Sequence, residues 1–140
     1  MTSFDTLIGH WSTESTHPKL DAAVTGHTTF EWLPGDRYLI QRAHNDHESF
    51  PDSISVIGPR ESGDSLLMEY FDSRGVRRTY DISCDAGTLH IWRDAPGFDQ
   101  RYTAALDDES FTGLWQLAES PGAWHDDVAV SYHRILETPS

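Results

Sequence analysis

The sequence predicts an all-β protein, a single antiparallel up-and-down barrel of about ten strands preceded by a short helical turn. Three observations favour this fold. Apolar and polar residues alternate along short segments, turn-forming residues separate these segments, and no segment carries the 3.6-residue apolar stripe of an amphipathic helix. Near-uniform hairpin connections are typical of a meander, and closing the meander into a barrel removes its exposed edge strands.

The elements follow one another along the chain with short turns between them. The helical turn is expected over Ser3 to Leu7, with Thr2 or Ser3 as its cap. Strands are expected at residues 10–17, 24–33, 37–48, 53–58, 66–71, 76–83, 88–93, 100–106, 111–117 and 124–135. Turn signals such as PGD at 34–36 and ESPG at 119–122 separate them. No linker, repeat or low-complexity block interrupts this pattern, so residues 1–140 are interpreted as one domain whose tail, 136–140, frays.

The composition suits a barrel and argues against several classes of partner. Hydrophobic residues make up 37% of the 140 residues and aromatic residues 11%, which indicates a modest core with large rings. The formal net charge of −13 repels phosphate groups and anionic lipid heads, so neither nucleic acid nor a membrane is an expected partner. The single cysteine, Cys84, excludes an internal disulfide. With no signal peptide in view, a cytoplasmic monomer or homodimer is expected.

Trp11 needs a partner, because it lies close to a terminus, where chains usually fray. In a closed meander the first and last strands lie side by side, and Arg134 lies near the end of the last expected strand. A guanidinium stacked on an indole contributes about 0.5–2 kcal/mol when it is shielded from water. We therefore expect Arg134 to stack on Trp11 at one end of the barrel.

Gly9, Trp11 and Arg134 together resemble the calycin pattern, in which lipocalins and related barrels begin with Gly-x-Trp and place a late basic side chain across that tryptophan. Within the calycins, the chain is more similar to the nitrobindin-like, ten-stranded barrels, over nearly its whole length. The similar segments are GHWSTESTHP at 9–18, FEWLPGDRYL at 30–39, YFDSRGVRRTYD at 70–81, QRY at 100–102 and VAVSYHR at 128–134. The resemblance implies a calycin-like β-barrel.

The same resemblance raises the question of haem. Nitrobindins bind haem through a histidine on the final strand, seven positions before the closing basic residue. Counting back from Arg134 reaches Asp127. A carboxylate does not replace a neutral imidazole as the usual axial ligand, so haem is disfavoured and no cofactor or metal is expected. His125 is close enough in the sequence to leave haem open as a third interpretation.

Strand alternation predicts which side chains line a cavity. Val128 and Val130 share the face of Arg134 on the last strand. The other predicted ligand-binding residues on inward faces are Met68, Tyr70, Arg78, Tyr80, Ile91, Tyr102 and Trp115. Arg78 and Tyr80 form an Arg-x-Tyr pair, which is similar to the carboxylate clamp of intracellular fatty-acid-binding proteins. The alternative is that Arg78 pairs with an acidic residue of a neighbouring strand.

The strand at 37–48 leaves its inward face undecided. If Ile40 faces inward, so do Arg42 and His44, which are then candidate ligand-binding residues. A neutral histidine beside an arginine could serve there as a hydrogen-bond donor or general base. If Leu39 faces inward instead, Arg42 and His44 lie on a solvated outer face.

The predicted function is that of an intracellular binding protein for a small, mostly apolar ligand, with or without a carboxylate. The alternative is a cavity enzyme that catalyses cyclisation, isomerisation or proton transfer on a small hydrophobic substrate. In that case Arg42 and His44, or Arg78 and Tyr80, would place a proton donor near the substrate. The sequence contains no Gly-x-Ser-x-Gly, no phosphate loop and no zinc ligand spacing, so no catalytic residue is assigned.

Overall fold

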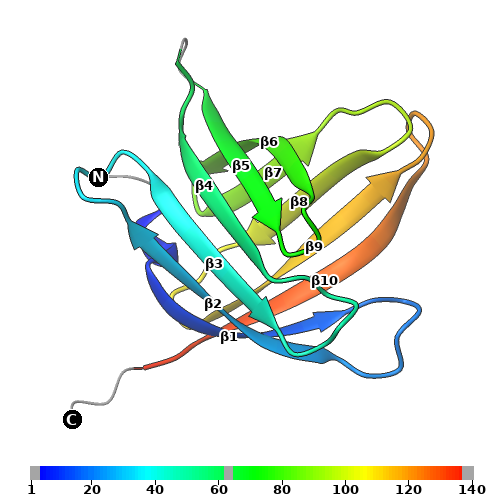
Figure 1. Ribbon diagram of the computed structural model, residues 1–140, viewed down its shortest axis with the longest axis horizontal. Coiled ribbons are helices and arrows are strands. Elements are labelled where there is room, and N and C mark those ends of the chain that lie inside the picture. The colour runs from blue at the N-terminus through cyan, green and yellow to red at the C-terminus, as the bar shows by residue number, and fades with distance from the viewer. Residues whose placement is uncertain (1–3, 62–64, 137–140) are drawn as a thin grey trace.

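The chain forms a closed antiparallel β-barrel in a computed structural model that describes residues 4–61 and 65–136 (Figure 1). These residues contain one 3-10 turn, η1 (Asp5–Leu7), and ten strands. The strands are β1 (Gly9–Thr16), β2 (Val24–Trp32), β3 (Leu39–Asn45), β4 (Ser53–Pro59), β5 (Leu66–Asp72), β6 (Arg77–Asp85), β7 (Thr88–Arg93), β8 (Asp99–Ala105), β9 (Ser110–Ala118) and β10 (Trp124–Arg134). No helix within the described ranges is long and apolar enough to cross a membrane.

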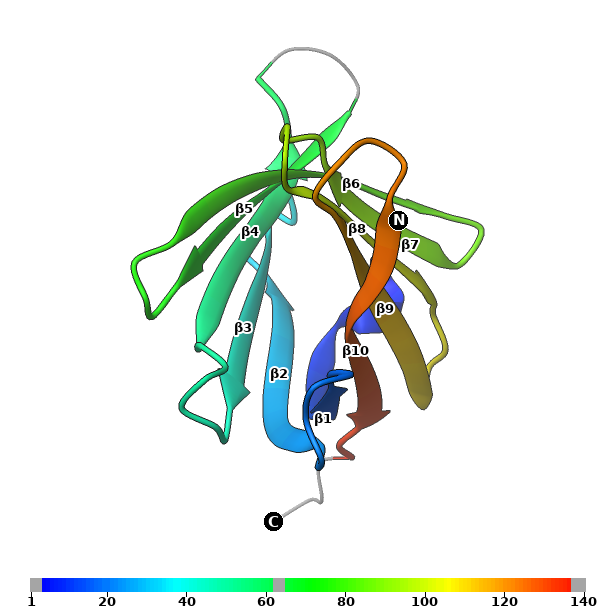
Figure 2. The ribbon, with the colours of Figure 1, turned by 90° about the vertical axis from the view of Figure 1, so that its right-hand side faces the viewer.

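Each strand pairs with its neighbours in the sequence, and the first strand pairs with the last. The β1–β10 ladder closes the barrel and places Trp11 opposite Arg134. Figure 2 shows the strands arranged in a ring, with β1 beside β10 and β2. The predicted all-β fold, an up-and-down barrel of ten strands, is therefore confirmed.

Most expected strands match the observed bounds to within one or two residues, and two expected elements need comment. The strand expected at 37–48 is β3, which spans only Leu39–Asn45, because residues after Asn45 turn back to form the β3–β4 connection. The N-terminal helical turn is a single 3-10 turn that begins after Phe4 without a side-chain cap. The expected cap residues, Thr2 and Ser3, lie outside the described residues, as does the end of the expected tail, 137–140.

The two ends of the barrel are built differently. One end, here called the closed end, carries η1 and the beginning of β1, and the buried side chains of Phe4 and Leu7 fill it. Because the strands alternate in direction, the connections after β1, β3, β5, β7 and β9 all lie at the opposite end, here called the open end. The open end lies to the right in Figure 1 and faces the viewer in Figure 2.

Trp11 is completely buried at the closed end. Its Nε1 donates a hydrogen bond to the Leu7 carbonyl oxygen at 2.8 Å, so the indole holds η1 against the barrel. Edge-to-face contacts join the indole to Phe111, at 5.1 Å between ring centroids, and to Tyr132 at 6.2 Å. The Arg134 guanidinium lies over the ring, with Cζ 4.2 Å from its centroid. The contact that the sequence predicts between Arg134 and Trp11 is therefore present.

Arg134 also uses its N–H groups to hold the chain that crosses the closed end. It donates to the carbonyl oxygens of Thr6, Ile8 and Asp108, with an Nη1–oxygen distance of 2.7 Å at Ile8. Gly9 makes room for this arginine: a Cβ at Gly9 would lie 2.7 Å from Nη1, and the φ of +125° is one that side chains rarely adopt. The structure thus supplies a physical reason for the glycine in the Gly-x-Trp motif.

Candidate functional site

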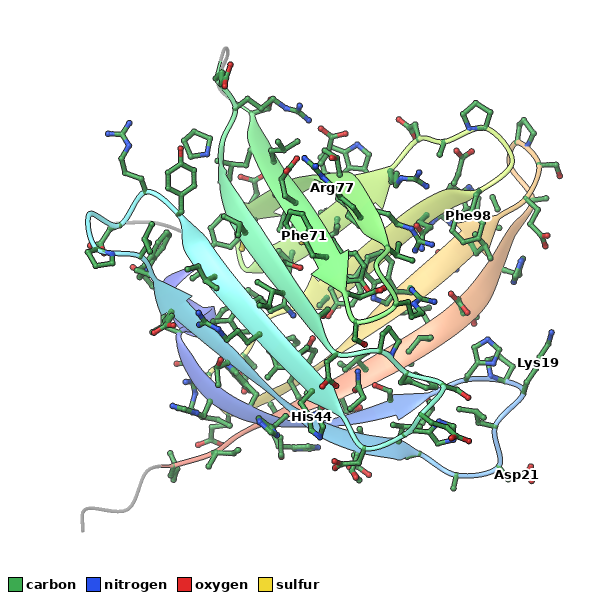
Figure 3. All side chains as sticks on the ribbon, in the orientation of Figure 1. Lys19, Asp21, His44, Phe71, Arg77 and Phe98 are labelled. Atoms are coloured by element: carbon green, nitrogen blue, oxygen red, sulfur yellow. The ribbon has the colours of Figure 1, made fainter. Side chains whose placement is uncertain are left out.

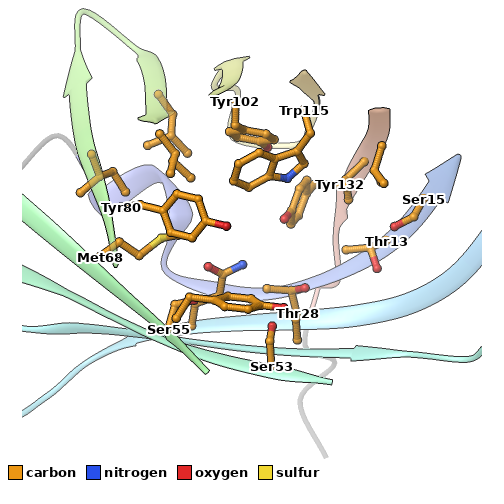
Figure 4. A pocket seen from close by; sticks show the side chains of 18 of the residues that line it. Thr13, Ser15, Thr28, Ser53, Ser55, Met68, Tyr80, Tyr102, Trp115 and Tyr132 are labelled. Carbon is orange, nitrogen blue, oxygen red and sulfur yellow. The ribbon is translucent and has the colours of Figure 1, made fainter. Parts of the chain in front are cut away.

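The barrel encloses a cavity of about 260 Å³ to which all ten strands contribute side chains (Figure 4). Phe50 and Pro51 of the β3–β4 connection line it at the open end, whereas Leu7 and Phe111 line it toward the closed end. Small-molecule sites usually measure roughly 300–1,000 Å³. This cavity therefore suits one compact molecule rather than a long chain.

Most of the side chains predicted to bind a ligand line this cavity. They are Met68, Tyr70, Arg78, Tyr80, Ile91, Tyr102, Trp115, Val128 and Val130. They come from β5 to β10, where large apolar side chains made the inward face easy to predict. Their position is an observation, and their role in binding stays a prediction.

Arg42 and His44 do not line the cavity, so the interpretation that turned them inward is wrong and the alternative with Leu39 inward is the observed one. Leu39 is fully buried in the core, and strand alternation then turns every second residue of β3 inward. The β3 residues that line the cavity are accordingly Gln41, Ala43 and Asn45. Arg42 and His44 lie on the outer face, where Figure 3 labels His44.

On that outer face both side chains are engaged in ion pairs. Arg42 pairs with Glu31 of the neighbouring strand β2. The two ring nitrogens of His44 lie 3.0 Å from Asp52 Oδ1 and 2.9 Å from Asp46 Oδ1. The hydrogen bond with Asp52, followed by that with Asp46, raises the pKa of His44 above its ordinary value. The contacts of His44 with Asp46 and Asp52 link strand β3 to the β3–β4 connection on the outside of the barrel.

One wall of the cavity, on β5 to β9, is aromatic. The rings of Tyr80 and Tyr102 lie 5.6 Å and 5.1 Å from that of Trp115, between centroids, and Tyr70 meets Tyr80 edge to face at 6.2 Å. Gly113 gives Tyr102 its position, since a Cβ there would fall 1.9 Å from the Tyr102 hydroxyl oxygen. Burial raises the pKa of Tyr102 well above its ordinary value, so its phenol stays protonated.

The hydroxyl groups of two of these tyrosines are already bonded within the protein. Tyr80 donates to Gln100 Oε1 at 3.1 Å, and Tyr70 donates to Asp72 Oδ2 at 2.7 Å. Burial, and then the bond with Asp72, raises the pKa of Tyr70. Tyr80 therefore does not reproduce the phenol of an Arg-x-Tyr clamp, because its proton is used by Gln100.

The opposite wall, on β1 to β4, carries several polar, uncharged side chains beside the apolar Phe30 and Ile57. Five of the polar residues bear a hydroxyl group, and Figure 4 shows them across the cavity from Tyr80, Tyr102 and Trp115. They are Thr13, Ser15, Thr28, Ser53 and Ser55. The sequence reasoning missed this wall, although a signal existed: Thr13 and Ser15 lie two and four residues after Trp11 and share its inward face.

Arg78 lies at the open end of the cavity, two residues into β6. Its guanidinium rests over the ring of Phe98, with Cζ 5.2 Å from the centroid. Within residues 4–61 and 65–136, Arg78 forms no ion pair, so the expected alternative of a structural acidic partner is not observed there. The neighbouring Arg77 does form such a pair, with Glu69 on the outer face.

Asp127 also lines the cavity, beside Val128, because the β9–β10 ladder shifts register between Asp126 and Ala129. Asp127 Oδ1 lies 3.0 Å from His17 Nε2. The backbone N–H of Lys19 donates to the other ring nitrogen of His17, also at 3.0 Å. Nδ1 is therefore a hydrogen-bond acceptor, and Nε2 donates a hydrogen bond to Asp127.

The residues near Asp127, the position at which nitrobindins carry the haem-binding histidine, do not fit the ligation of haem iron. Asp127 presents a carboxylate, and both nitrogens of His17 are occupied by hydrogen bonds. His125 is exposed, lies 3.7 Å from Glu119 and does not line the cavity. In the described part of the chain, no cluster of three or more His, Cys, Asp or Glu side chains could hold a metal ion.

The barrel is similar to several solved structures, among them one that it matches over nearly the whole of both chains. The crystal structure of Rv2717c from M. tuberculosis superposes with a TM-score of 0.63 and covers 97% of this chain and 99% of that chain, at 11% sequence identity. Neither a scan against protein-family models nor a search of curated proteins found a match. At such low identity the likeness concerns the fold, and it supports the closed barrel described above.

Proposed function

We propose that this barrel, which resembles the nitrobindin-like calycins in sequence, binds one small, mostly apolar molecule in its cavity. The apolar part of the ligand packs against the aromatic wall of Tyr80, Tyr102 and Trp115. An acid group of the ligand meets Arg78 at the open end. The proposal includes no haem, because Asp127 and His17 do not present a free imidazole.

The proposal rests on the surroundings of the Arg78 guanidinium, which lacks an acidic partner among the described residues. It lines a cavity, packs on Phe98 and has no carboxylate within 4 Å in the described part of the chain. Its N–H groups are therefore available to a ligand, and a carboxylate matches their fork-like geometry. Asp127 pairs with His17, and among the described residues no ion pair joins Asp127 to Arg78.

The alternative of a cavity enzyme loses three of the four residues that supported it, and only Arg78 remains in the cavity with its donors available. Arg42 and His44 face outward, and the hydroxyl proton of Tyr80 is donated to Gln100. Binding is therefore the function that the geometry favours. The cytoplasmic location and the monomeric or homodimeric state stay predictions from the sequence.

The experiment compares an acid with its ester in the wild type and in Arg78→Leu. Binding of 2-naphthoic acid and methyl 2-naphthoate is measured by isothermal titration calorimetry. Charge-assisted hydrogen bonds contribute about 1.5–3 kcal/mol, and about 1.4 kcal/mol is a factor of ten. We expect Arg78→Leu to weaken binding of the acid by roughly ten- to a hundredfold and to leave binding of the ester almost unchanged.

Arg77→Leu is the matched control, because it removes the same charge from the outer face one residue away. It should leave the acid preference intact. An equal loss of acid and ester in Arg78→Leu, or no acid preference in the wild type, would contradict the role of Arg78. Failure of both probes to bind would contradict the binding function itself.

A further inference from the structure

We infer that the ligand carries neutral oxygen groups, hydroxyl or carbonyl, along the edge that faces β1 to β4. This inference rests on the proposed binding function and narrows the class of ligand. The expected molecule is a compact aromatic or alicyclic compound with an apolar face toward Trp115 and an oxygen-bearing edge toward Thr28. A wholly apolar molecule of the same size should bind less well.

Three hydroxyl-bearing residues on this wall are buried, and their hydroxyl groups have no hydrogen-bond partner among the described residues. Thr13, Thr28 and Ser55 are only 4%, 2% and 3% exposed, and all three line the cavity. None of them forms a side-chain hydrogen bond within the described residues. They come from β1, β2 and β4 and lie on one side of the cavity, with Gln41 and Ala43 of β3 between Thr28 and Ser55; this side is here called the arc.

These hydroxyl groups open into the cavity. In the described part of the chain, no side-chain nitrogen or oxygen is both fully enclosed and without a hydrogen-bond partner. The hydroxyl oxygens of Thr13, Thr28 and Ser55 therefore reach the cavity space, where water or a ligand can bond to them. Thr13 also lies over Gly26, whose missing Cβ would approach the Thr13 hydroxyl oxygen to 3.1 Å.

The buried hydroxyl groups favour ligands that can form hydrogen bonds with them, because leaving a buried hydroxyl group without a hydrogen bond costs free energy. An apolar molecule that displaced water from this arc would leave buried hydroxyls without partners, which is unfavourable. A molecule with oxygens on the same edge replaces the lost water bonds, since a hydroxyl side chain both donates and accepts. No charged side chain lines the cavity from β1 to β4, so this edge suits neutral oxygens, and an acid group belongs at Arg78.

The facing wall restricts the shape of the ligand. Tyr80 and Trp115 present ring faces and edges, and the cavity measures about 260 Å³. A flat molecule of two fused rings fits this combination better than a flexible chain. Naphthalene, 2-naphthol and 2,7-dihydroxynaphthalene therefore form a suitable probe series, because they differ only in the number of hydroxyl groups.

The test measures the affinity of these three probes by isothermal titration calorimetry. The wild type should bind 2,7-dihydroxynaphthalene at least tenfold more tightly than naphthalene. Thr28→Val, which replaces the hydroxyl by a methyl of similar size, should weaken the dihydroxy compound by five- to tenfold and leave naphthalene binding equal or tighter. Ser55→Ala should act in the same direction and serves as a second variant if Thr28→Val folds poorly.

Thr112→Val is the matched control, because Thr112 lies on the outer face of β9 and its hydroxyl bonds to Ser131 at 3.0 Å. It should change none of the three affinities. Equal affinity of the wild type for all three probes, or equal losses for naphthalene and its diol in Thr28→Val, would overturn the inference and leave the binding function standing. Failure of all three probes and of 2-naphthoic acid would overturn both.

Discussion

The two ends of the barrel each place an arginine over an aromatic ring, with different consequences. At the closed end, Arg134 Cζ lies 4.2 Å from the centroid of Trp11, a ring with no exposed surface. At the open end, Arg78 Cζ lies 5.2 Å from the centroid of Phe98, a residue that is 38% exposed. In the first pair the ring is fully buried beneath a partly exposed guanidinium, and the second pair borders the cavity and solvent.

The hydrogen bonds of the two guanidinium groups explain the difference. Arg134 donates to three backbone carbonyl oxygens, so its N–H groups hold the closed end together. Within the described residues Arg78 donates to no acceptor in the protein, so its N–H groups remain for a ligand. At the closed end the arginine donors therefore contribute to stability, and at the open end they are the groups that the proposed ligand would use.

The largest expected effect is that of Trp11→Ala. The substitution removes a fully buried ring that contacts Phe111 and Tyr132, so we expect a loss of about 3–5 kcal/mol in the free energy of unfolding. Urea unfolding followed by far-ultraviolet circular dichroism measures it. Trp92→Ala, on a partly exposed tryptophan of β7, should cost much less. Similar losses in the two variants would show that the closed end is not the more stable region.

The next effect is that of Arg134→Ala. Three backbone carbonyl oxygens lose a charged donor, and we expect a loss of roughly 2–3 kcal/mol, since hydrogen bonds to charged groups contribute about 1.5–3 kcal/mol. The double variant with Trp11→Ala should cost less than the sum of the two single losses, by about 0.5–2 kcal/mol, because the stacking energy is counted twice. Strict additivity in urea unfolding would mean that the two side chains do not interact.

A smaller effect on stability is expected for Arg78→Leu. The guanidinium has no acceptor in the described part of the chain, and leucine joins the apolar neighbours on β6, so the free energy of unfolding should change by no more than about 0.5 kcal/mol. Thermal unfolding of the ligand-free protein measures it. A loss as large as that of Arg134→Ala would assign Arg78 a structural role and remove the contrast between the two ends.

The smallest effect concerns His44, which fastens the β3–β4 connection near the open end. Asp52 and Asp46 raise its pKa in the folded protein, so the stabilisation is complete below the ordinary value of about 6.5 and is lost as the pH rises through the raised value. Conversely, hydrogen bonding from His44 and from the Asn45 N–H lowers the pKa of Asp52. We therefore expect stability to fall slightly as the pH rises above about 6.5.

Urea midpoints between pH 5.5 and 8.5 should show this fall in the wild type and a weaker one in His44→Gln. His90→Gln, on the outer face of β7, is the control and should keep the wild-type slope. The same slope in His44→Gln as in the wild type would show that the contacts with Asp46 and Asp52 do not contribute.

The sequence by itself determined the strands, their order and the meeting of the first and last strands. Alternation and turn residues are local signals, so β7 (Thr88–Arg93) was predicted with its observed bounds and β2 to within one residue. Once ten strands form a meander, closure alone brings Trp11 to Arg134. Large apolar residues such as Met68 and Trp115 likewise indicated the inward face of their own strands.

Only the tertiary structure decided the chemistry of the cavity. On β3 both faces carry apolar and polar residues, so the burial of Leu39 in the shared core was needed to turn Arg42 outward. The register shift in β10 turned Asp127 inward beside Val128, against simple alternation. The polar wall, and the absence of an acidic partner for Arg78 among the described residues, depend on which strands face one another across a closed barrel. That relation is set by non-local pairing, which no short stretch of sequence encodes.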